Sequence, residues 1–161
     1  MTERLRDRLI GAWELIDVVE EPVDGSPARH PMGERPLGLI LYTPDGYMSA
    51  QIMQRERAAV SADWTDLTPE DYRQEAMTYF AYSGPYSVDE EKGLLQHSMT
   101  VSLFPGWVGQ TQPRAVEIDG DVLHLSTPSP TLSGAQLVMT HIRWRRAGVS
   151  AAAPSSGDAG W

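Results

Sequence analysis

Apolar and polar residues alternate over short segments along most of the chain, and turn-forming residues separate these segments. Alternation with a period of two places every second side chain on the same face of a β-strand. Clusters of Gly, Pro, Asp and Ser between such segments are typical of turns. The pattern therefore predicts an antiparallel, all-β fold with strands near residues 13–20, 37–43, 47–54, 94–104, 108–119, 122–126 and 136–146.

The turn signals connect these strands into a meander. Pro-Asp-Gly at 44–46 is a strong hairpin signal, because proline presets φ and Asp-Gly tolerates the positive φ that such a turn requires. Pro-Gly at 105–106 and Asp-Gly-Asp at 119–121 mark later turns. The stretch 127–134 is rich in Pro, Ser and Thr, and we expect a loop there before the last strand.

Two segments have helical spacing instead. Residues 2–10 predict a short N-terminal helix with charged and apolar faces. Thr68 precedes Pro69 and two acidic residues, which is the pattern of a capped helix start. This second helix, inserted between strands, has an expected apolar stripe of Tyr72, Ala76, Tyr79 and Phe80.

About eight strands suffice to close a barrel around its own side chains or around one small ligand. Closure also removes exposed sheet edges. A β-sandwich is the alternative, and periodicity does not separate the two. We expect one barrel domain over residues 1–146 and a flexible tail over 147–161, which is small, polar and rich in glycine.

Specific residues add a resemblance to this pattern. Gly11-Ala12-Trp13, at the head of the first strand and after a short helical turn, resembles the G-x-W opening of lipocalin and calycin barrels. In those barrels a basic residue of the last strand covers the tryptophan at the closed end. The resemblance makes Arg145 or Arg143 the candidate for that position here.

A longer set of segments resembles the bacterial and fungal lipocalin-like domain family, which is often found beside natural-product biosynthesis genes. The match covers residues 9–145 and implies a short barrel with a pocket open at one end. Other lipocalin-like barrels are cofactor-free cyclases, isomerases or lyases, and such an activity here is an analogy. The matching segments are residues 36–48, 80–86, His97, residues 105–114 and Trp144-Arg145.

Strand parity selects the residues that could do chemistry inside such a barrel. His97, Arg114, Tyr42 and Tyr82 each share a face with apolar neighbours, so we expect all four to point inward as candidate catalytic residues. A few polar groups in an apolar cavity are typical of a small-molecule site. Candidate ligand-binding residues are Tyr86, Gln112, Trp107, Met99, Ile40 and Tyr79.

Each of these groups has an alternative role. His97 could move a proton near neutral pH, or it could be a buried, hydrogen-bonded histidine. Arg114 either pairs with a carboxylate, Asp17 or Glu14, or awaits an anionic or enolate-like ligand. The tyrosines could donate to an oxyanion or simply pack in strands.

Composition narrows the function classes. The 161 residues carry 22 acidic and 13 basic side chains, a net charge of −9, which disfavours nucleic acid and anionic membranes as partners. There is no cysteine, no His pair at metal-ligand spacing and no nucleotide-binding glycine motif, so we expect neither metal nor cofactor. Residues 1–8 lack the apolar run of a secretion signal, and we expect a cytoplasmic protein.

Three functions are consistent with the sequence. The leading hypothesis is a barrel that binds a small apolar, carbonyl-bearing metabolite and catalyses a cofactor-free isomerisation, cyclisation or elimination, with His97 moving the proton and Arg114 holding an oxyanion. The alternative is a carrier that binds such a ligand without chemistry. A third interpretation is a filled barrel with no ligand cavity. The oligomeric state is open, and we allow for a homodimer.

Overall fold

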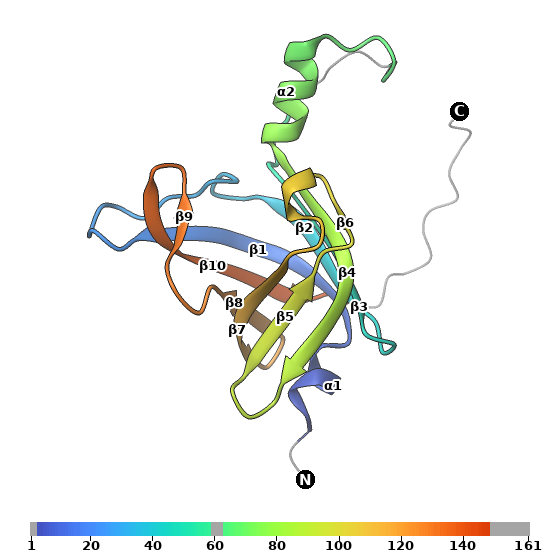
Figure 1. Ribbon diagram of the computed structural model, residues 1–161, viewed down its shortest axis with the longest axis vertical. Coiled ribbons are helices and arrows are strands. Elements are labelled where there is room, and N and C mark those ends of the chain that lie inside the picture. The colour runs from blue at the N-terminus through green and yellow to red at the C-terminus, as the bar shows by residue number, and fades with distance from the viewer. Residues whose placement is uncertain (1–2, 59–62, 149–161) are drawn as a thin grey trace.

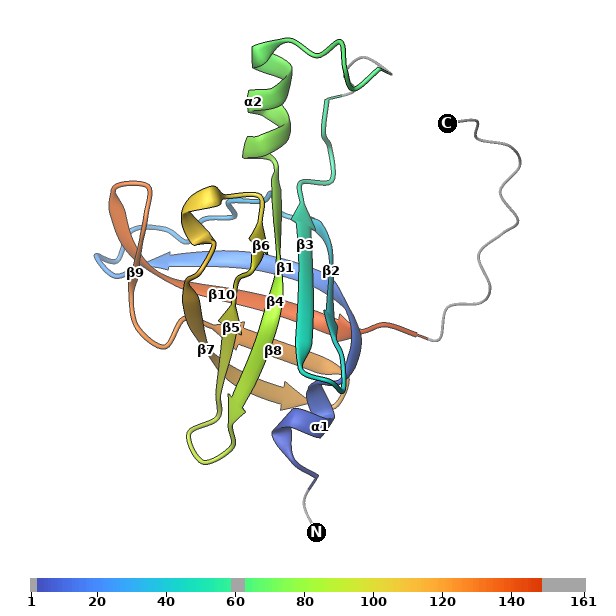
Figure 2. The same cartoon turned by 45° about the vertical axis from the view of Figure 1, so that its right-hand side comes forward.

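The computed structural model describes residues 3–58 and 63–148, and its strands wrap into a closed antiparallel barrel (Figures 1 and 2). The helices are α1 (Leu5–Leu9) and α2 (Pro69–Met77), with a 3-10 turn η1 (Pro105–Trp107). The strands are β1 (Gly11–Pro22), β2 (Leu37–Tyr42), β3 (Tyr47–Met53), β4 (Tyr79–Asp89), β5 (Leu94–Ser98), β6 (Val101–Ser102), β7 (Thr111–Asp119), β8 (Val122–Ser126), β9 (Thr131–Ser133) and β10 (Gln136–Arg146).

Hydrogen bonding runs around the barrel in the order β1-β2-β3-β4-β5-β7-β8-β10, and β10 returns to pair with β1. The sandwich alternative is thereby excluded, and the predicted barrel is confirmed. The short strands β6 and β9 lie off this circuit, on β4 and β10 respectively. Of the expected tail 147–161, residues 149–161 lie outside the described residues.

The predicted strand 94–104 is interrupted by an irregularity. Tyr86 pairs with His97, but Ser83 pairs with Val101, so the second strand contains one extra residue between these pairs. Such a bulge reverses the inside and outside positions that follow it. Val101 is therefore exposed, although in an uninterrupted strand it would share the inward face of His97, four residues earlier. Gly84 lies opposite the bulge, where a Cβ would come within 1.9 Å of the Ser98 carbonyl oxygen.

The inserted helix differs from its prediction. Its start is as expected, because Thr68 and Asp71 form a reciprocal capping box around Pro69. However, α2 ends at Met77 and has no buried residue, while Tyr79 and Phe80, expected on its apolar stripe, belong to β4. Figures 1 and 2 show α2 projecting away from the barrel, so no core element covers that stripe.

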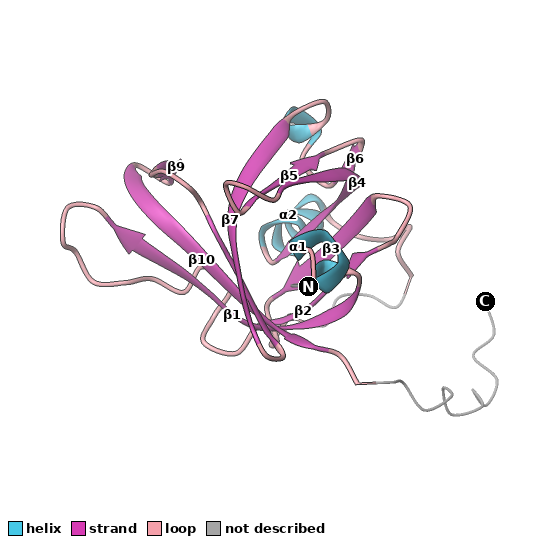
Figure 3. Ribbon diagram, turned by 90° about the horizontal axis from the view of Figure 1, so that it is seen from below, coloured by secondary structure: helices cyan, strands magenta, loops and turns pink. Residues whose placement is uncertain are grey.

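The barrel is filled and sealed at the end where α1 lies, which Figure 3 shows in the foreground. Trp13 and Trp144 are fully buried there, and the indole N–H of Trp13 donates to the Leu9 carbonyl at 2.9 Å. Large buried aromatic side chains contribute much of the stability of a core. The indole N–H of Trp144, in contrast to that of Trp13, has no hydrogen-bond partner among the described residues. No helix of the described residues has the length and apolarity needed to cross a membrane.

Arg146 covers Trp13, and the expectation of Arg145 or Arg143 was wrong. Its guanidinium carbon lies 4.0 Å from the centre of the indole ring, and its two terminal nitrogens donate to the carbonyls of Ile10 and Arg8. The reason is parity, since Trp144 points inward and Arg146, two residues later, shares its face. Arg145 is exposed on the outer face.

We predict that Arg146→Ala lowers the free energy of unfolding by about 2 to 3 kcal/mol, because it removes two charge-assisted hydrogen bonds and a cation–π contact. Arg145→Ala is the matched control, with the same loss of charge on the outer face and an expected change within about 0.5 kcal/mol. Urea denaturation of both variants measures the difference. Equal stability of the two variants would mean that Arg146 does not secure the closed end.

Candidate functional site

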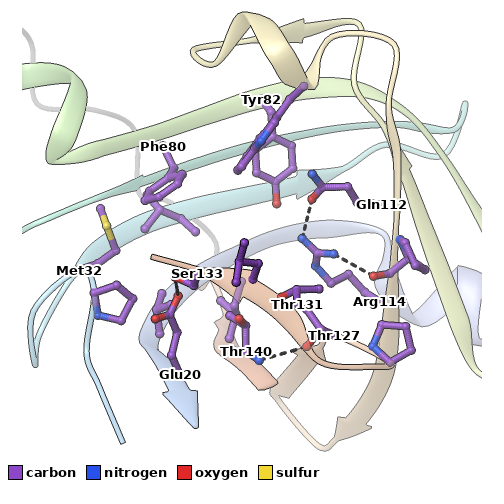
Figure 4. Close-up of a pocket in the computed structure, with 18 of the residues that line it drawn as sticks. Glu20, Met32, Phe80, Tyr82, Gln112, Arg114, Thr127, Thr131, Ser133 and Thr140 are labelled. Carbon is purple, nitrogen blue, oxygen red and sulfur yellow. Dashed lines mark hydrogen bonds between the residues drawn. The ribbon is translucent and has the colours of Figure 1, made fainter. Parts of the chain in front are cut away.

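A cavity of about 480 Å³ lies in the part of the barrel away from α1 (Figure 4). Pockets that bind small molecules commonly have volumes of roughly 300–1,000 Å³ and are mostly apolar with a few polar groups. The third interpretation, a filled barrel, therefore does not hold. The lining residues come from β1, β3, β4, η1, β7, β9, β10 and the adjoining loops.

One wall of the cavity is aromatic. Phe80 and Tyr82 project from β4, and Trp107 from η1 lies beside both, with ring centres 6.0 and 5.9 Å away. Phe104 supports this wall at 4.8 Å from Trp107. Ile52, Met32 and Ile142 add aliphatic surface. The wall offers flat apolar surface of the kind that binds an aromatic or conjugated ligand.

Arg114 and Gln112 form a polar group on β7 at the same cavity. One terminal nitrogen of Arg114 donates to Gln112 Oε1 at 2.9 Å and the other to the Pro113 carbonyl at 2.8 Å. Figure 4 shows the Tyr82 hydroxyl directed toward this group. Tyr82 is buried, and desolvation raises its pKa while the Arg114 charge acts in the opposite sense. The hydroxyl thus stays neutral and can donate a hydrogen bond.

The expected carboxylate partners of Arg114 are engaged elsewhere. Asp17 forms an ion pair with Arg143 on the outer face, and Glu14 is exposed opposite Arg145. Among the described residues no carboxylate lies within 4 Å of Arg114. The alternative in which Arg114 pairs with Asp17 or Glu14 was therefore wrong.

Glu20 is a cavity residue that the sequence analysis passed over. It is 8% exposed, pairs with Arg29 at 2.8 Å and accepts a hydrogen bond from the Ser133 hydroxyl at 2.7 Å. Its parity with Val18, which also lines the cavity, is the signal that could have identified it.

His97 does not line the cavity and lies in the core beside it. Its Nε2 is 2.8 Å from the Tyr42 hydroxyl, its Nδ1 is buried without a hydrogen-bond partner, and its ring centre is 6.0 Å from that of Tyr82. Burial, with the Arg114 charge as a smaller cause, lowers the pKa of His97 to about 3. Burial likewise raises the pKa of Tyr42. Both side chains are neutral at neutral pH.

Some of the other predicted site residues line the cavity, and the rest do not. Tyr82, Arg114, Gln112 and Trp107 line the cavity, whereas Ile40 and Met99 are core residues. Tyr86 also lies in the core, where its hydroxyl donates to the Thr43 carbonyl. Tyr79 is half-buried, and its hydroxyl donates to Gln51 Oε1 at 2.6 Å. The described residues contain no cluster of three or more side chains suited to hold a metal ion.

We predict that His97 makes stability depend on pH. Its pKa is near 6.5 when unfolded and about 3 when folded, so between these values the unfolded chain binds a proton that the native chain does not. The folding equilibrium constant should then fall by up to about tenfold per pH unit as pH drops through this window.

In His97→Gln this contribution disappears, so the stability gap between native protein and variant narrows as pH falls from 6.5 toward 4. Urea denaturation over that range measures the gap, and His30→Gln, at an exposed position, is the control. Parallel curves for the native protein and His97→Gln would contradict the buried, neutral state of His97.

Comparisons with known proteins agree with this architecture. The lipocalin-like domain family matches residues 10–147. A protein of Aspergillus oryzae (strain ATCC 42149 / RIB 40), named 4'-hydroxy-3'-methoxypropiophenone carrier protein, is 30% identical over 106 residues, which cover 62% of this chain and 96% of that protein. The chain therefore belongs to the lipocalin-like domain family.

Proposed function

We propose that this barrel is a carrier for a small, largely apolar aromatic metabolite that bears a carbonyl group. The observation that carries the proposal is the cavity, in which the aromatic wall of Phe80, Tyr82 and Trp107 faces a space of about 480 Å³. The similar Aspergillus protein is named a carrier of an aryl ketone, and its ligand has the same character.

The positions of the polar groups suit such a ligand. Tyr82 and Gln112 lie next to Arg114, so a carbonyl or hydroxyl oxygen could be bound there while the ring packs on the aromatic wall. A buried polar group of the ligand must be hydrogen-bonded, because leaving it unpaired costs about 1–3 kcal/mol. The Arg114 group therefore orients the ligand as well as binding it.

A carrier fits these residues better than the isomerase, cyclase or lyase that the sequence first suggested. Such a catalyst moves a proton, and the group at the cavity needs a pKa near the working pH. His97 is separated from the cavity and has a pKa of about 3, while Tyr82 has a raised pKa. The guanidinium of Arg114 can donate hydrogen bonds but has no lone pair with which to accept a proton. Glu20 is held by Arg29 and Ser133.

We predict that Thr140→Phe, which fills the cavity from β10, weakens binding of 4'-hydroxy-3'-methoxypropiophenone at least about tenfold. Thr111→Phe adds the same ring at an exposed position and should bind as the native protein does. Titration calorimetry gives the affinities, and Trp107 provides a fluorescence signal from the cavity. If both variants bind equally, the ligand does not occupy this cavity.

Analysis of the ligand after incubation with the protein distinguishes a carrier from an enzyme. After long incubation with excess protein, a carrier returns the ketone unchanged by mass spectrometry, whereas a catalyst yields a product. Native mass spectrometry of the protein purified from its own host extends the test to the natural ligand. A bound compound recovered together with its isomer or elimination product would replace the carrier proposal with the catalytic one.

A further inference from the structure

We infer that the cavity binds its ligand as an anion, through an ionised acidic oxygen of a phenol, enol or carboxylic acid held by Arg114. This inference rests on the proposed function, because it assumes that the cavity is the ligand site. The inference specifies the charge of the bound ligand and names Arg114 as the residue that selects for this charge. The sequence left open whether Arg114 is paired or awaits an anion, and the contacts around it favour the second.

The first argument is that the charge of Arg114 is uncompensated. The carboxylates that could have paired with it, Asp17 and Glu14, are on the outer face of β1, and Asp17 is bound to Arg143. Glu20, the carboxylate among the lining residues, already has Arg29 as its partner at 2.8 Å. In the described part of the chain, the guanidinium therefore has no carboxylate partner within 4 Å.

The second argument concerns the donors that remain. A guanidinium has five N–H groups, and the two bonds to Gln112 Oε1 and the Pro113 carbonyl use one on each terminal nitrogen. Both acceptors come from the same strand as Arg114, so they hold the group in place without neutralising it. The remaining N–H groups can form the paired bonds that guanidinium makes with anionic oxygens.

The third argument is the state of the other titratable groups around Arg114. Tyr82 on β4 and Tyr42 on β2 are buried and have raised pKa values, and His97 on β5 has a pKa of about 3. Glu20 on β1 is paired with Arg29. Between about pH 5 and 9, Tyr42, Tyr82 and His97 are therefore all neutral. None of them supplies a negative charge that could compensate the charge of Arg114 in place of an anionic ligand.

The aromatic wall then explains why the anion belongs to a conjugated molecule. Phe80, Tyr82 and Trp107 line the same cavity as Arg114, and Figure 4 shows the Tyr82 hydroxyl directed toward the guanidinium. An ionised oxygen attached to a ring can accept from Arg114 and Tyr82 while the ring packs on the wall. Inorganic anions and aliphatic acids would leave that apolar surface uncovered.

The test uses 7-hydroxycoumarin, an aromatic carbonyl compound with an acidic hydroxyl, and 7-methoxycoumarin, its neutral counterpart. The absorption spectrum of the first reports its ionisation directly. We expect the native protein to prefer the phenolate over the phenol by about tenfold or more, seen as a lower ligand pKa in the complex. Affinity for 7-methoxycoumarin should not change between pH 5 and 9.

Variants then assign the effect to one residue. Arg114→Gln should abolish the preference for the phenolate, so that the ligand pKa in the complex equals that of free 7-hydroxycoumarin, while Arg114→Lys, which keeps the charge, should retain part of the preference. Arg145→Gln removes the same charge from the outer face and should behave as the native protein. If a variant does not fold, the comparison of the two coumarins in the native protein still tests the inference.

The two proposals fail in different ways. If 7-methoxycoumarin binds in the cavity but 7-hydroxycoumarin binds without a change in its ionisation, the anion inference is overturned and the carrier proposal stands. If neither coumarin binds the native protein while the propiophenone does, the anion inference is likewise overturned. If neither the coumarins nor the propiophenone bind, the cavity is not a site for this class of ligand and both proposals fall.

Discussion

The pairing of β1 with β10 is the constraint on which the rest of this structure depends. These are the first and last long strands, and their register runs from Trp13 opposite Arg146 to Pro22 opposite Val138. Pairing them turns a meander with two exposed edges into a closed barrel with a defined interior. It also determines what lies at each end, with the Trp13 and Arg146 contact at one and the cavity residues Glu20 and Thr140 at the other.

The interior divides along the barrel axis into a filled part and an open part. Toward α1 the space is occupied by large side chains such as Trp13, Trp144 and Leu123, all fully buried. The cavity is lined by residues further from α1, such as Glu20 and Thr140, and neither Tyr42 nor His97 lines it. Close packing of the first part gives the barrel its rigidity, so the second can remain open at little cost to the fold.

Sequence alternation predicted which side chains point inward, but it did not predict their height along the axis. Tyr42, His97, Tyr82 and Arg114 all face the interior as parity requires, yet only Tyr82 and Arg114 reach the cavity. Height depends on the stagger between neighbouring strands, which hydrophobic pattern alone does not encode. The bulge before Val101 had no sequence signal other than Gly84 on the partner strand, whereas correct parity would have selected Arg146 over Arg145.

The low pKa of His97 matters for the cavity although His97 does not line it. A protonated imidazole beside Tyr82 would add a second positive charge behind Arg114 and would itself be buried without a counterion, which is costly. Burial keeps it neutral, and Tyr42 and Tyr82 are neutral for the same reason. None of these three side chains therefore adds a charge that would compete with Arg114 at the cavity. The chain as a whole carries a net charge of −9, which repels anions. The positive charge of Arg114 at the cavity therefore gives an anionic or strongly polar ligand one favourable orientation.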